Sequence, residues 1–150
     1  MKFSFASPND ENNVKKILQD NDLHHQDITA SHLEHFLLLG DGAELVGVVG
    51  LEIKENCALL RSLAVSGSYR KKGLASQLVR KIEELANAHN VDTLYLLTVT
   101  AESFFTNRGY QKTDRRAAPP QIQETEEFKN LCPASAVCMV KHLNPKSFRK

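Results

Sequence analysis

The chain has 150 residues and a mass of 16.8 kDa, a size that fits one folded domain. Its hydrophobic content of 41% and its charged content of 25% are those of ordinary globular proteins, which excludes a disordered or fibrous chain. With 19 basic and 18 acidic side chains the net charge is +1, so we expect no nucleic-acid partner, because the broad positive field of such proteins is missing.

The distribution of apolar residues and cysteines points to the cytoplasm. No window approaches the roughly 18 to 20 apolar residues that a membrane helix needs, and residues 1–4 lead into no apolar run typical of a signal peptide. Cys57, Cys132 and Cys138 form an odd set without clustered spacing, which predicts free thiols. We therefore expect a cytoplasmic protein without membrane contact.

The first part of the chain predicts a strand followed by two helices. Residues 2–6 can form the strand, and the Ser-Pro pair at 7–8 is typical of a helix start. Apolar residues at positions 14, 17 and 18 then share one helical face. Residues 31–34 can add a short second helix.

The middle of the chain predicts an antiparallel meander and then a long helix. Strands at 36–39, 45–53 and 57–65 are separated by Gly-Asp-Gly and Lys-Glu-Asn turns. Residues 72–88 have the clearest helical periodicity in the chain. Residues 91–98 are rich in apolar and β-branched side chains, and we expect them to run parallel to 57–65 after a right-handed crossover.

The remaining residues predict short helices and strands in alternation. They are a helix at 101–107 closed by Gly109, a strand at 110–115, a helix at 122–130 and a strand at 135–143. Together the elements predict an α/β (α+β) class with a mixed, mostly antiparallel sheet and helices on both faces. We expect one domain over 1–143 and a basic tail at 144–150.

A basic turn between the 57–65 strand and the 72–88 helix is the most informative segment. Unpaired amides of a first helical turn and the helix dipole attract anions, and a glycine lets a ligand approach the backbone. Arg70, Lys71 and Lys72 add positive charge beside Gly73. The turn therefore suits a diphosphate. A solvated basic turn that merely starts a helix is the alternative, because it would have the same sequence pattern.

In this setting Arg70-x-x-Gly73-x-Ala75 resembles the acyl-CoA pyrophosphate motif of the GCN5-related N-acetyltransferases (GNAT), Gln/Arg-x-x-Gly-x-Gly/Ala. Residues 91–98 look like the family's fifth strand, and Ala101-x-x-x-Phe105-x-x-x-Gly109-Tyr110 looks like its next helix and Gly-Phe/Tyr exit. The resemblance is best over residues 45–115 and looser over the rest. It implies a GNAT-like fold and acetyl transfer.

A narrower resemblance concerns two runs of residues. They are Leu97-Thr98-x-Thr100-Ala101-Glu102-x-Phe104-Phe105-x-x-x-Gly109-Tyr110 and the later Glu127-Phe128-x-x-Leu131-Cys132-Pro133-Ala134-Ser135-Ala136. These residues look like arsenic-resistance N-acetyltransferases and, more distantly, like the acetyltransferase domain of N-acetylglutamate synthases. Both comparisons imply an amino acid or an analogue as acceptor, an arsenical glutamate mimic included.

The GNAT resemblance also implies acetyl-CoA as the acetyl donor. The pyrophosphate would lie at the basic turn, the pantetheine arm along the edge of the strand, and the acetyl oxygen near a backbone N–H around Leu63. The residues assigned to the donor are Leu63, Ala64, Val65, Arg70, Lys71, Lys72, Gly73, Leu74, Ala75 and Ser76.

The sequence departs from the family at Phe105, where a tyrosine often protonates the leaving thiolate. A thiol with a pKa of about 8.5 can leave as thiolate without an acid. Tyr95, Tyr110, Ser103 or a water molecule could also donate the proton, and the sequence does not choose among them.

The acceptor amine must lose a proton before it attacks. Glu52 and Glu102 are the candidate bases, with deprotonation through water as an equal alternative. Arg61 lies on a central strand and needs an anionic partner, which could be a substrate carboxylate or an internal acid. Thr98 and Thr100, with Phe105, are candidates for the acceptor pocket.

A group of histidines and a pair of cysteines could bind a metal or an arsenical, but neither is predicted to do so. His24, His25, His32 and His35 crowd a short stretch but match no known ligand pattern, so we predict no metal site. Cys132 and Cys138 could bind a soft arsenical, but buried inert thiols are the simpler interpretation.

The sequence thus predicts an acetyl-CoA-dependent N-acetyltransferase acting on the primary amine of a small molecule by direct transfer. Acetylation of proteins or peptides is one alternative, and an acyl-CoA-binding sensor without turnover is another. Whether the chain forms a homodimer is left open.

Overall fold

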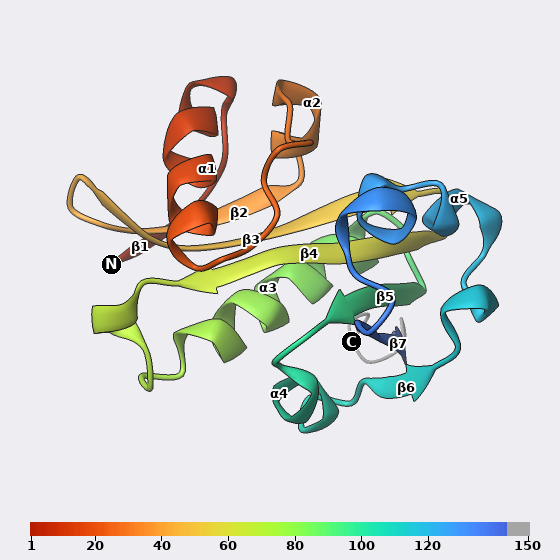
Figure 1. Ribbon diagram of the computed structural model, residues 1–150. Helices are drawn as coiled ribbons and strands as arrows, with labels where there is room; N and C mark the ends of the chain where they lie inside the picture. Colours follow the sequence, from red (N-terminus) through yellow and green to blue (C-terminus); the bar gives the residue numbers. More distant parts are fainter. Residues whose placement is uncertain (144–150) are drawn as a thin grey trace. The chain divides into compact units, whose positions relative to one another are not determined.

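The computed structural model describes residues 1–143 and contains the predicted kind of mixed sheet (Figure 1). Its seven strands are hydrogen-bonded in the order β1-β2-β3-β4-β5-β7-β6. Met1–Glu52 and Leu60–Leu85 form one compact unit, and Ile53–Leu59 belongs with the residues from Ala86 onward to a second unit. Strand β4 (Cys57–Val65) and helix α3 (Leu74–Ala88) contribute residues to both units.

The basic tail predicted at 144–150 lies outside the described residues. No helix among residues 1–143 has the length and apolar content to cross a bilayer.

The first unit is a sheet with helices on both faces, as Figure 1 shows. Helices α1 and α2 cover one face of the strands and α3 covers the other. β1 pairs antiparallel with β2, and β2 pairs antiparallel with β3. Besides β4 and α3, the unit contains β1 (Lys2–Phe5), the 3-10 turn η1 (Pro8–Asp10), α1 (Glu11–Asp20), α2 (Ala30–Leu33), β2 (Phe36–Asp41), β3 (Glu44–Lys54, up to Glu52) and the 3-10 turn η2 (Gly67–Tyr69).

The apolar stripe of α1 explains why the helix packs where it does. Val14, Ile17 and Leu18 are buried, as the spacing predicts. They form a core with side chains from α2 and from strands β2, β3 and β4, namely Ile28, Leu33, Phe36, Leu38, Val48 and Ala64. On the opposite side, a Cβ at Gly47 would lie 3.1 Å from a methyl group of Leu78, so the missing side chain allows α3 to approach β3 closely.

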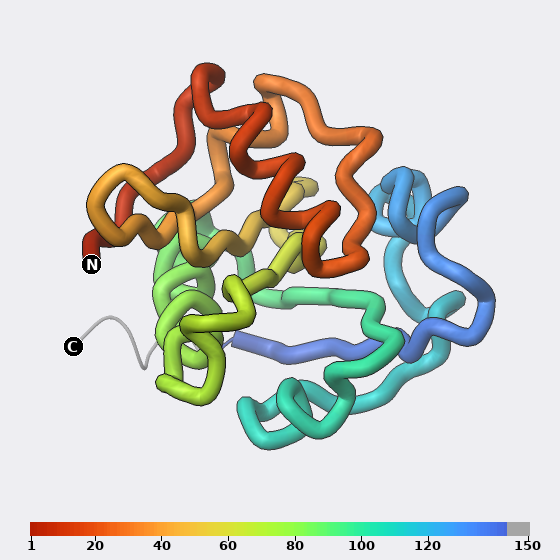
Figure 2. Tube along the Cα trace, turned by 60° about the vertical axis from the view of Figure 1, so that its left-hand side comes forward, coloured from red at the N-terminus to blue at the C-terminus, as the bar shows by residue number. Residues whose placement is uncertain are grey.

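The second unit is built around β5 (Thr93–Thr98). Cys57, Ala58 and Leu59 of β4 run parallel to Thr93–Tyr95, which confirms the predicted parallel pairing of the two strands. β7 (Val137–His142) pairs antiparallel with β5 along its whole length, and Figure 2 shows the two segments running side by side. The other elements are α4 (Glu102–Thr106), β6 (Gln111–Thr113), the 3-10 turn η3 (Arg115–Ala117), α5 (Pro120–Gln123) and the π-helical turn η4 (Glu127–Leu131).

The single helix predicted at 122–130 is wrong in detail, because two short turns replace it. The Thr125 hydroxyl donates to the Ile122 carbonyl at 2.7 Å, which satisfies the last turn of α5 locally. The Arg115 guanidinium then donates to the Phe128 and Pro133 carbonyls at 2.8 and 2.9 Å and holds the end of η4. The strand predicted at 110–115 is likewise shorter, since η3 begins at Arg115.

Candidate functional site

The basic turn adopts a conformation that only a few residue types favour. η2 follows β4, and the backbone then turns left-handed at Lys71, with φ of 66°, and again at Gly73, with φ of 75°. Because of this second left-handed residue, α3 begins at Leu74, two residues later than predicted. The Gln77 N–H donates to the Gly73 carbonyl at 3.2 Å, and this carbonyl precedes the helix. The backbone N–H groups of residues 74–76 belong to the first turn of α3, which has no earlier helical turn to bond to.

The turn has the features that a diphosphate needs. A Cβ built at Gly73 meets no atom within 4 Å, which shows open space beside the backbone. Lys71, Lys72 and Gly73 are exposed, so the positive charge of the turn is accessible to a ligand. The positive end of the α3 dipole lies at the same place. The residues present therefore fit the nucleotide end of coenzyme A.

The side chain of Arg70 was expected to add charge around the amides of the turn, but it forms hydrogen bonds within the protein. Its Nε donates to the Val65 carbonyl at 3.0 Å, and its Nη2 donates to the side-chain oxygen of Asn21. Arg70 thus links the turn to the end of β4 and to the residue that follows α1. The charge remains nearby, but the side chain supports the shape of the turn.

A second tether comes from the neighbouring residue. The Tyr69 hydroxyl donates to Asp41 Oδ2 at 2.7 Å, and this hydrogen bond raises the pKa of Tyr69 to about 12. Asp41 is the last residue of β2, so the hairpin of β2 and β3 holds the turn from another side. Two side chains that precede Gly73 therefore preorganise the backbone that follows them.

The strand segment expected to hold the pantetheine arm is the end of β4. Ala64 and Val65 are buried and Leu63 is half-buried. The pairing of β4 with β5 covers Cys57–Leu59, so Leu63–Val65 lies beyond that ladder.

Arg61 lies at the centre of a buried ion-pair cluster. Its side chain is 0% exposed, and Nη1 and Nη2 bind the two oxygens of Asp27 at 2.5 and 2.8 Å. Nη1 also donates to Glu52 Oε2 at 2.7 Å. Arg61 therefore has anionic partners inside the protein. This is the internal ion pair, and not the substrate carboxylate, of the two partners that the sequence allows.

The neighbouring groups explain why the carboxylate of Asp27 stays charged although it is buried. Burial alone raises the pKa of Asp27, but the hydrogen bond and the positive charge of Arg61 outweigh it, so the pKa of Asp27 lies below its usual value. Arg61 Nε donates to the Ser62 hydroxyl at 2.9 Å. Ser62 itself is left-handed, with φ of 62° in the middle of β4, a strained conformation for a serine.

His32 approaches the same cluster from α2. Its Nδ1 accepts the Thr29 backbone N–H at 3.0 Å, so the neutral ring carries its proton on Nε2. Nε2 lies 3.9 Å from Glu52 Oε1. The side-chain ligand atoms of Asp27, His32 and Glu52 are within 4.8 Å of one another. This tautomer and the guanidinium of Arg61 both disfavour a metal ion there.

The remaining candidates belong to the second unit. The Thr98 hydroxyl accepts the Ala101 N–H at 2.9 Å and so supports the start of α4, whereas Thr100 is exposed. Glu102 is 42% exposed and lies 3.7 Å from Lys112. Phe105 is buried and packs edge-to-face on Phe104 and on Tyr110.

The candidate proton donors and thiols also lie in the second unit. Tyr110 is 1% exposed, burial raises the pKa of Tyr95, and Ser103 is exposed. The three cysteines are free thiols, as predicted. Burial raises the pKa of Cys57 and raises that of Cys138 to about 11, which makes these two unreactive.

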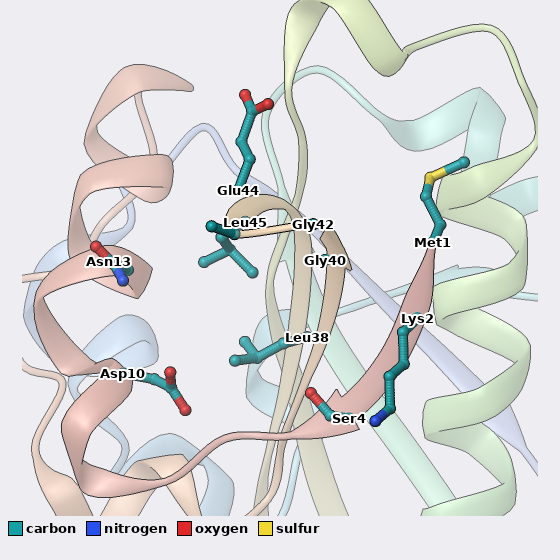
Figure 3. A pocket seen from close by; sticks show the side chains of 11 residues that line it. Met1, Lys2, Ser4, Asp10, Asn13, Leu38, Gly40, Gly42, Glu44 and Leu45 are labelled. Atoms are coloured by element: carbon teal, nitrogen blue, oxygen red, sulfur yellow. The ribbon is translucent and has the colours of Figure 1, made fainter.

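A pocket of about 460 Å³ lies elsewhere in the first unit, between α1 and strands β1 to β3. Figure 3 shows Asp10 of η1 and Asn13 of α1 facing Leu38 and Leu45 of the hairpin. Asp10 already accepts hydrogen bonds from the backbone and the hydroxyl of Ser7. None of the residues predicted for donor, acceptor or catalysis lines this pocket.

The sequence did not identify Asp27, His32 or Ser62 as parts of the cluster. Asp27 lies 34 positions before Arg61 in an irregular segment, where no periodicity indicates a contact. One signal was Thr29 followed three residues later by His32. At this spacing the side chain of the later residue can accept the backbone N–H of the residue that starts the helix.

Comparisons with known proteins show the family of the chain. Residues 5–112 match the model of the acetyltransferase (GNAT) family. The chain is 28% identical over 92 residues to an uncharacterized N-acetyltransferase of Chlorobaculum tepidum, a match that covers 61% of this chain and 59% of that protein. It is 33% identical over 64 residues to an amino-acid acetyltransferase of Ectopseudomonas mendocina, covering 43% of this chain and 15% of that protein. The chain therefore spans less than two thirds of the length of either curated relative.

Solved structures show the same fold. N-acetylglutamate synthase of Neisseria gonorrhoeae, in complex with coenzyme A and N-acetyl-glutamate, superposes with a TM-score of 0.82 at 19% identity, over 95% of this chain and 35% of that one. Rv2747 of Mycobacterium tuberculosis, in complex with CoA, gives a TM-score of 0.80 at 14% identity, over 96% and 100% of the two chains. With a family match over residues 5–112 and this fold, the chain belongs to the GNAT acetyltransferase family.

Proposed function

We propose that this protein is an acetyl-CoA-dependent N-acetyltransferase that acetylates the primary amine of a small molecule by direct transfer. Acetyl-CoA is the acetyl donor of the family to which the chain belongs, and it supplies an activated thioester. The observation that carries the proposal is the turn before α3, with its left-handed Gly73, its open backbone and its lysines. Residues 70–76 would hold the pyrophosphate, and the backbone of Leu63–Val65 would pair with the pantetheine arm.

The geometry favours Glu52 over Glu102 as the base. Glu52 is 9% exposed, and Arg61 fixes one of its oxygens, whereas Glu102 is 42% exposed beside Lys112. A carboxylate held in place by a buried partner loses less entropy when it engages a substrate. In the proposed reaction Glu52 takes one proton from the acceptor ammonium, and the freed amine lone pair forms the C–N bond. The C–S bond breaks, the thiolate leaves as the anion, and the second amine proton passes to water or to the released thiolate.

The leaving thiolate needs no tyrosine at position 105. A thiol with a pKa of about 8.5 leaves readily as the anion. Tyr110 is 1% exposed and packs against Phe105, so its hydroxyl sits within the core of the second unit. A water molecule or no acid at all is therefore the simpler route for this chain.

An amino acid or amino-acid analogue is the acceptor class that we propose. The similarity to an amino-acid acetyltransferase and the fold shared with N-acetylglutamate synthase support it. An arsenical glutamate mimic is a narrower proposal, supported by the sequence resemblance over residues 97–110. Action in the cytoplasm, as one domain over 1–143, completes the proposal.

Thiol release from acetyl-CoA is the direct test. The protein is incubated with amino acids, polyamines and lysine-containing peptides, and free CoA thiol is measured against a no-amine blank. Release with amino acids, and acetylated amine in the products, is the expected result. Release only with peptides would replace the proposed acceptor by a protein substrate.

A non-catalytic acyl-CoA sensor is the second candidate, and it is favoured by the burial of Phe105 at the usual tyrosine position. CoA binding by calorimetry without thiol release from any amine would establish it in place of the enzyme.

A further inference from the structure

One carboxylate oxygen in the Arg61 cluster keeps its hydrogen-bonding capacity. Asp27 uses both oxygens on the guanidinium, while Glu52 uses only Oε2. Within residues 1–143, Glu52 Oε1 receives no hydrogen bond, and His32 Nε2 lies 3.9 Å from it, beyond hydrogen-bonding distance. Two carboxylates and one guanidinium leave a net charge of −1 on side chains that are at most 9% exposed. A cation placed at Oε1 would balance that charge.

His32 offers a complementary donor beside this acceptor. The Thr29 N–H occupies Nδ1, so the proton of the neutral ring stays on Nε2. That N–H has no acceptor at hydrogen-bonding distance among the described residues. The contact of Nδ1 with the Thr29 N–H also caps the start of α2, so the ring can donate from Nε2 without giving up the cap.

We propose that Glu52 and His32 together recognise an α-amino acid. The ammonium donates to Glu52 Oε1, and an oxygen of the carboxylate on the adjacent carbon accepts from His32 Nε2. The two protein atoms are 3.9 Å apart, a spacing that suits charged groups attached to one carbon atom. The inference rests on the proposed acetyl transfer and adds a specificity-determining residue, His32, and a substrate class, α-amino acids in preference to amines without a carboxylate.

The buried part of the cluster serves this recognition through Glu52. Arg61 fixes Glu52 Oε2 at 2.7 Å, and Asp27 and Ser62 fix Arg61 in turn. Oε1 is then the oxygen left to face a ligand. Asp27 and Arg61 are positioning residues in this scheme, since each acts through Glu52.

Two substitutions at His32 separate recognition from capping. In His32→Asn the side-chain oxygen can still accept the Thr29 N–H, but no donor reaches the position of Nε2. In His32→Gln the longer side chain can place an N–H near that position. A merely structural role predicts that Asn and Gln both behave like the wild type.

The test compares each standard L-amino acid that reacts with the amine lacking only its α-carboxylate, for example L-glutamate with 4-aminobutyrate and L-alanine with ethylamine. We expect the wild type to prefer the amino acid in kcat/KM. We expect His32→Asn to reduce that preference about tenfold or more, the effect of losing one charge-assisted hydrogen bond, and His32→Gln to recover most of it. Calorimetry of L-glutamate binding with CoA present should follow the same order.

An unchanged preference in His32→Asn, with thermal unfolding like that of the wild type, would overturn the recognition by His32 and leave the acetyl transfer standing. Equal activity of the wild type on amino acids and their decarboxylated amines would do the same. CoA binding without thiol release from any of these compounds would instead overturn the proposed function, and this inference with it.

Discussion

The guanidinium of Arg61 holds the carboxylate of Asp27 through two parallel hydrogen bonds, Nη1 to Oδ2 at 2.5 Å and Nη2 to Oδ1 at 2.8 Å. The two residues are 34 positions apart, and the pair fastens the segment between α1 and α2 to strand β4. The same guanidinium orients Glu52, so one buried contact supports both the fold of the first unit and the candidate base.

Asp27→Asn should destabilise the protein strongly. The change leaves the guanidinium paired with Glu52 and turns an amide N–H toward one of its own N–H groups, so one charge-assisted hydrogen bond is lost. The expected loss is about 1.5 to 3 kcal/mol in the free energy of unfolding. Urea unfolding monitored by circular dichroism measures it. Asp114→Asn is the matched control, because Asp114 forms a similar pair with Arg116 on the surface. We expect no measurable change there. Equal effects of the two substitutions would contradict the special role of the buried pair.

The same pair predicts how stability depends on pH. The pKa of Asp27 is lowered in the folded protein, so its contribution is complete above the unfolded-state value of about 3.9 and is lost as the pH falls through the folded-state value. The wild type should therefore lose free energy of unfolding below about pH 4. Asp27→Asn should show a flatter acid limb, as measured by urea midpoints between neutral and acidic pH. Parallel acid limbs in the two proteins would show that other carboxylates control this range.

Local patterns predicted the elements well but did not predict the buried cluster. Helix α3 follows from the regular apolar spacing of Leu74, Leu78 and Ile82, and β4 lies at its predicted residues. Pairing between Asp27 and Arg61 depends on how an irregular segment packs on a strand, which no periodicity records. The left-handed Ser62 was equally hidden, because nothing in an apolar strand signals a positive φ at a serine.

Gly73→Glu should abolish CoA binding. The substitution places a carboxylate where phosphate should lie and adds a side chain at a backbone φ of 75°, which favours glycine. Calorimetric titration with CoA is expected to show no binding at concentrations that saturate the wild type.

The control for Gly73→Glu is Gly42→Glu in the β2–β3 hairpin. Gly42 has a φ of 63°, and a Cβ there also meets no atom within 4 Å, so the strain and the added charge are matched. We expect this variant to lose some stability and to keep its CoA affinity. If both variants lose binding equally, strain rather than phosphate repulsion explains the result. If Gly73→Glu binds normally, the anion site is wrong.

Phe105→Tyr tests whether the leaving thiolate lacks only a proton donor. Phe105 is 5% exposed, with its ring edge-to-face on Phe104 and Tyr110 at centroid distances of 5.1 and 5.3 Å. A thiolate that leaves unaided gains at most a helpful donor from the new hydroxyl, so turnover should stay the same or rise in a thiol-release assay. Phe104→Tyr adds the same hydroxyl to the adjacent half-buried ring and should leave turnover unchanged. Complete loss of turnover in Phe105→Tyr alone, with unfolding and CoA affinity intact, would mean that the ring of Phe105 shapes the acceptor pocket, because a polar atom would then disturb the acceptor and not the donor.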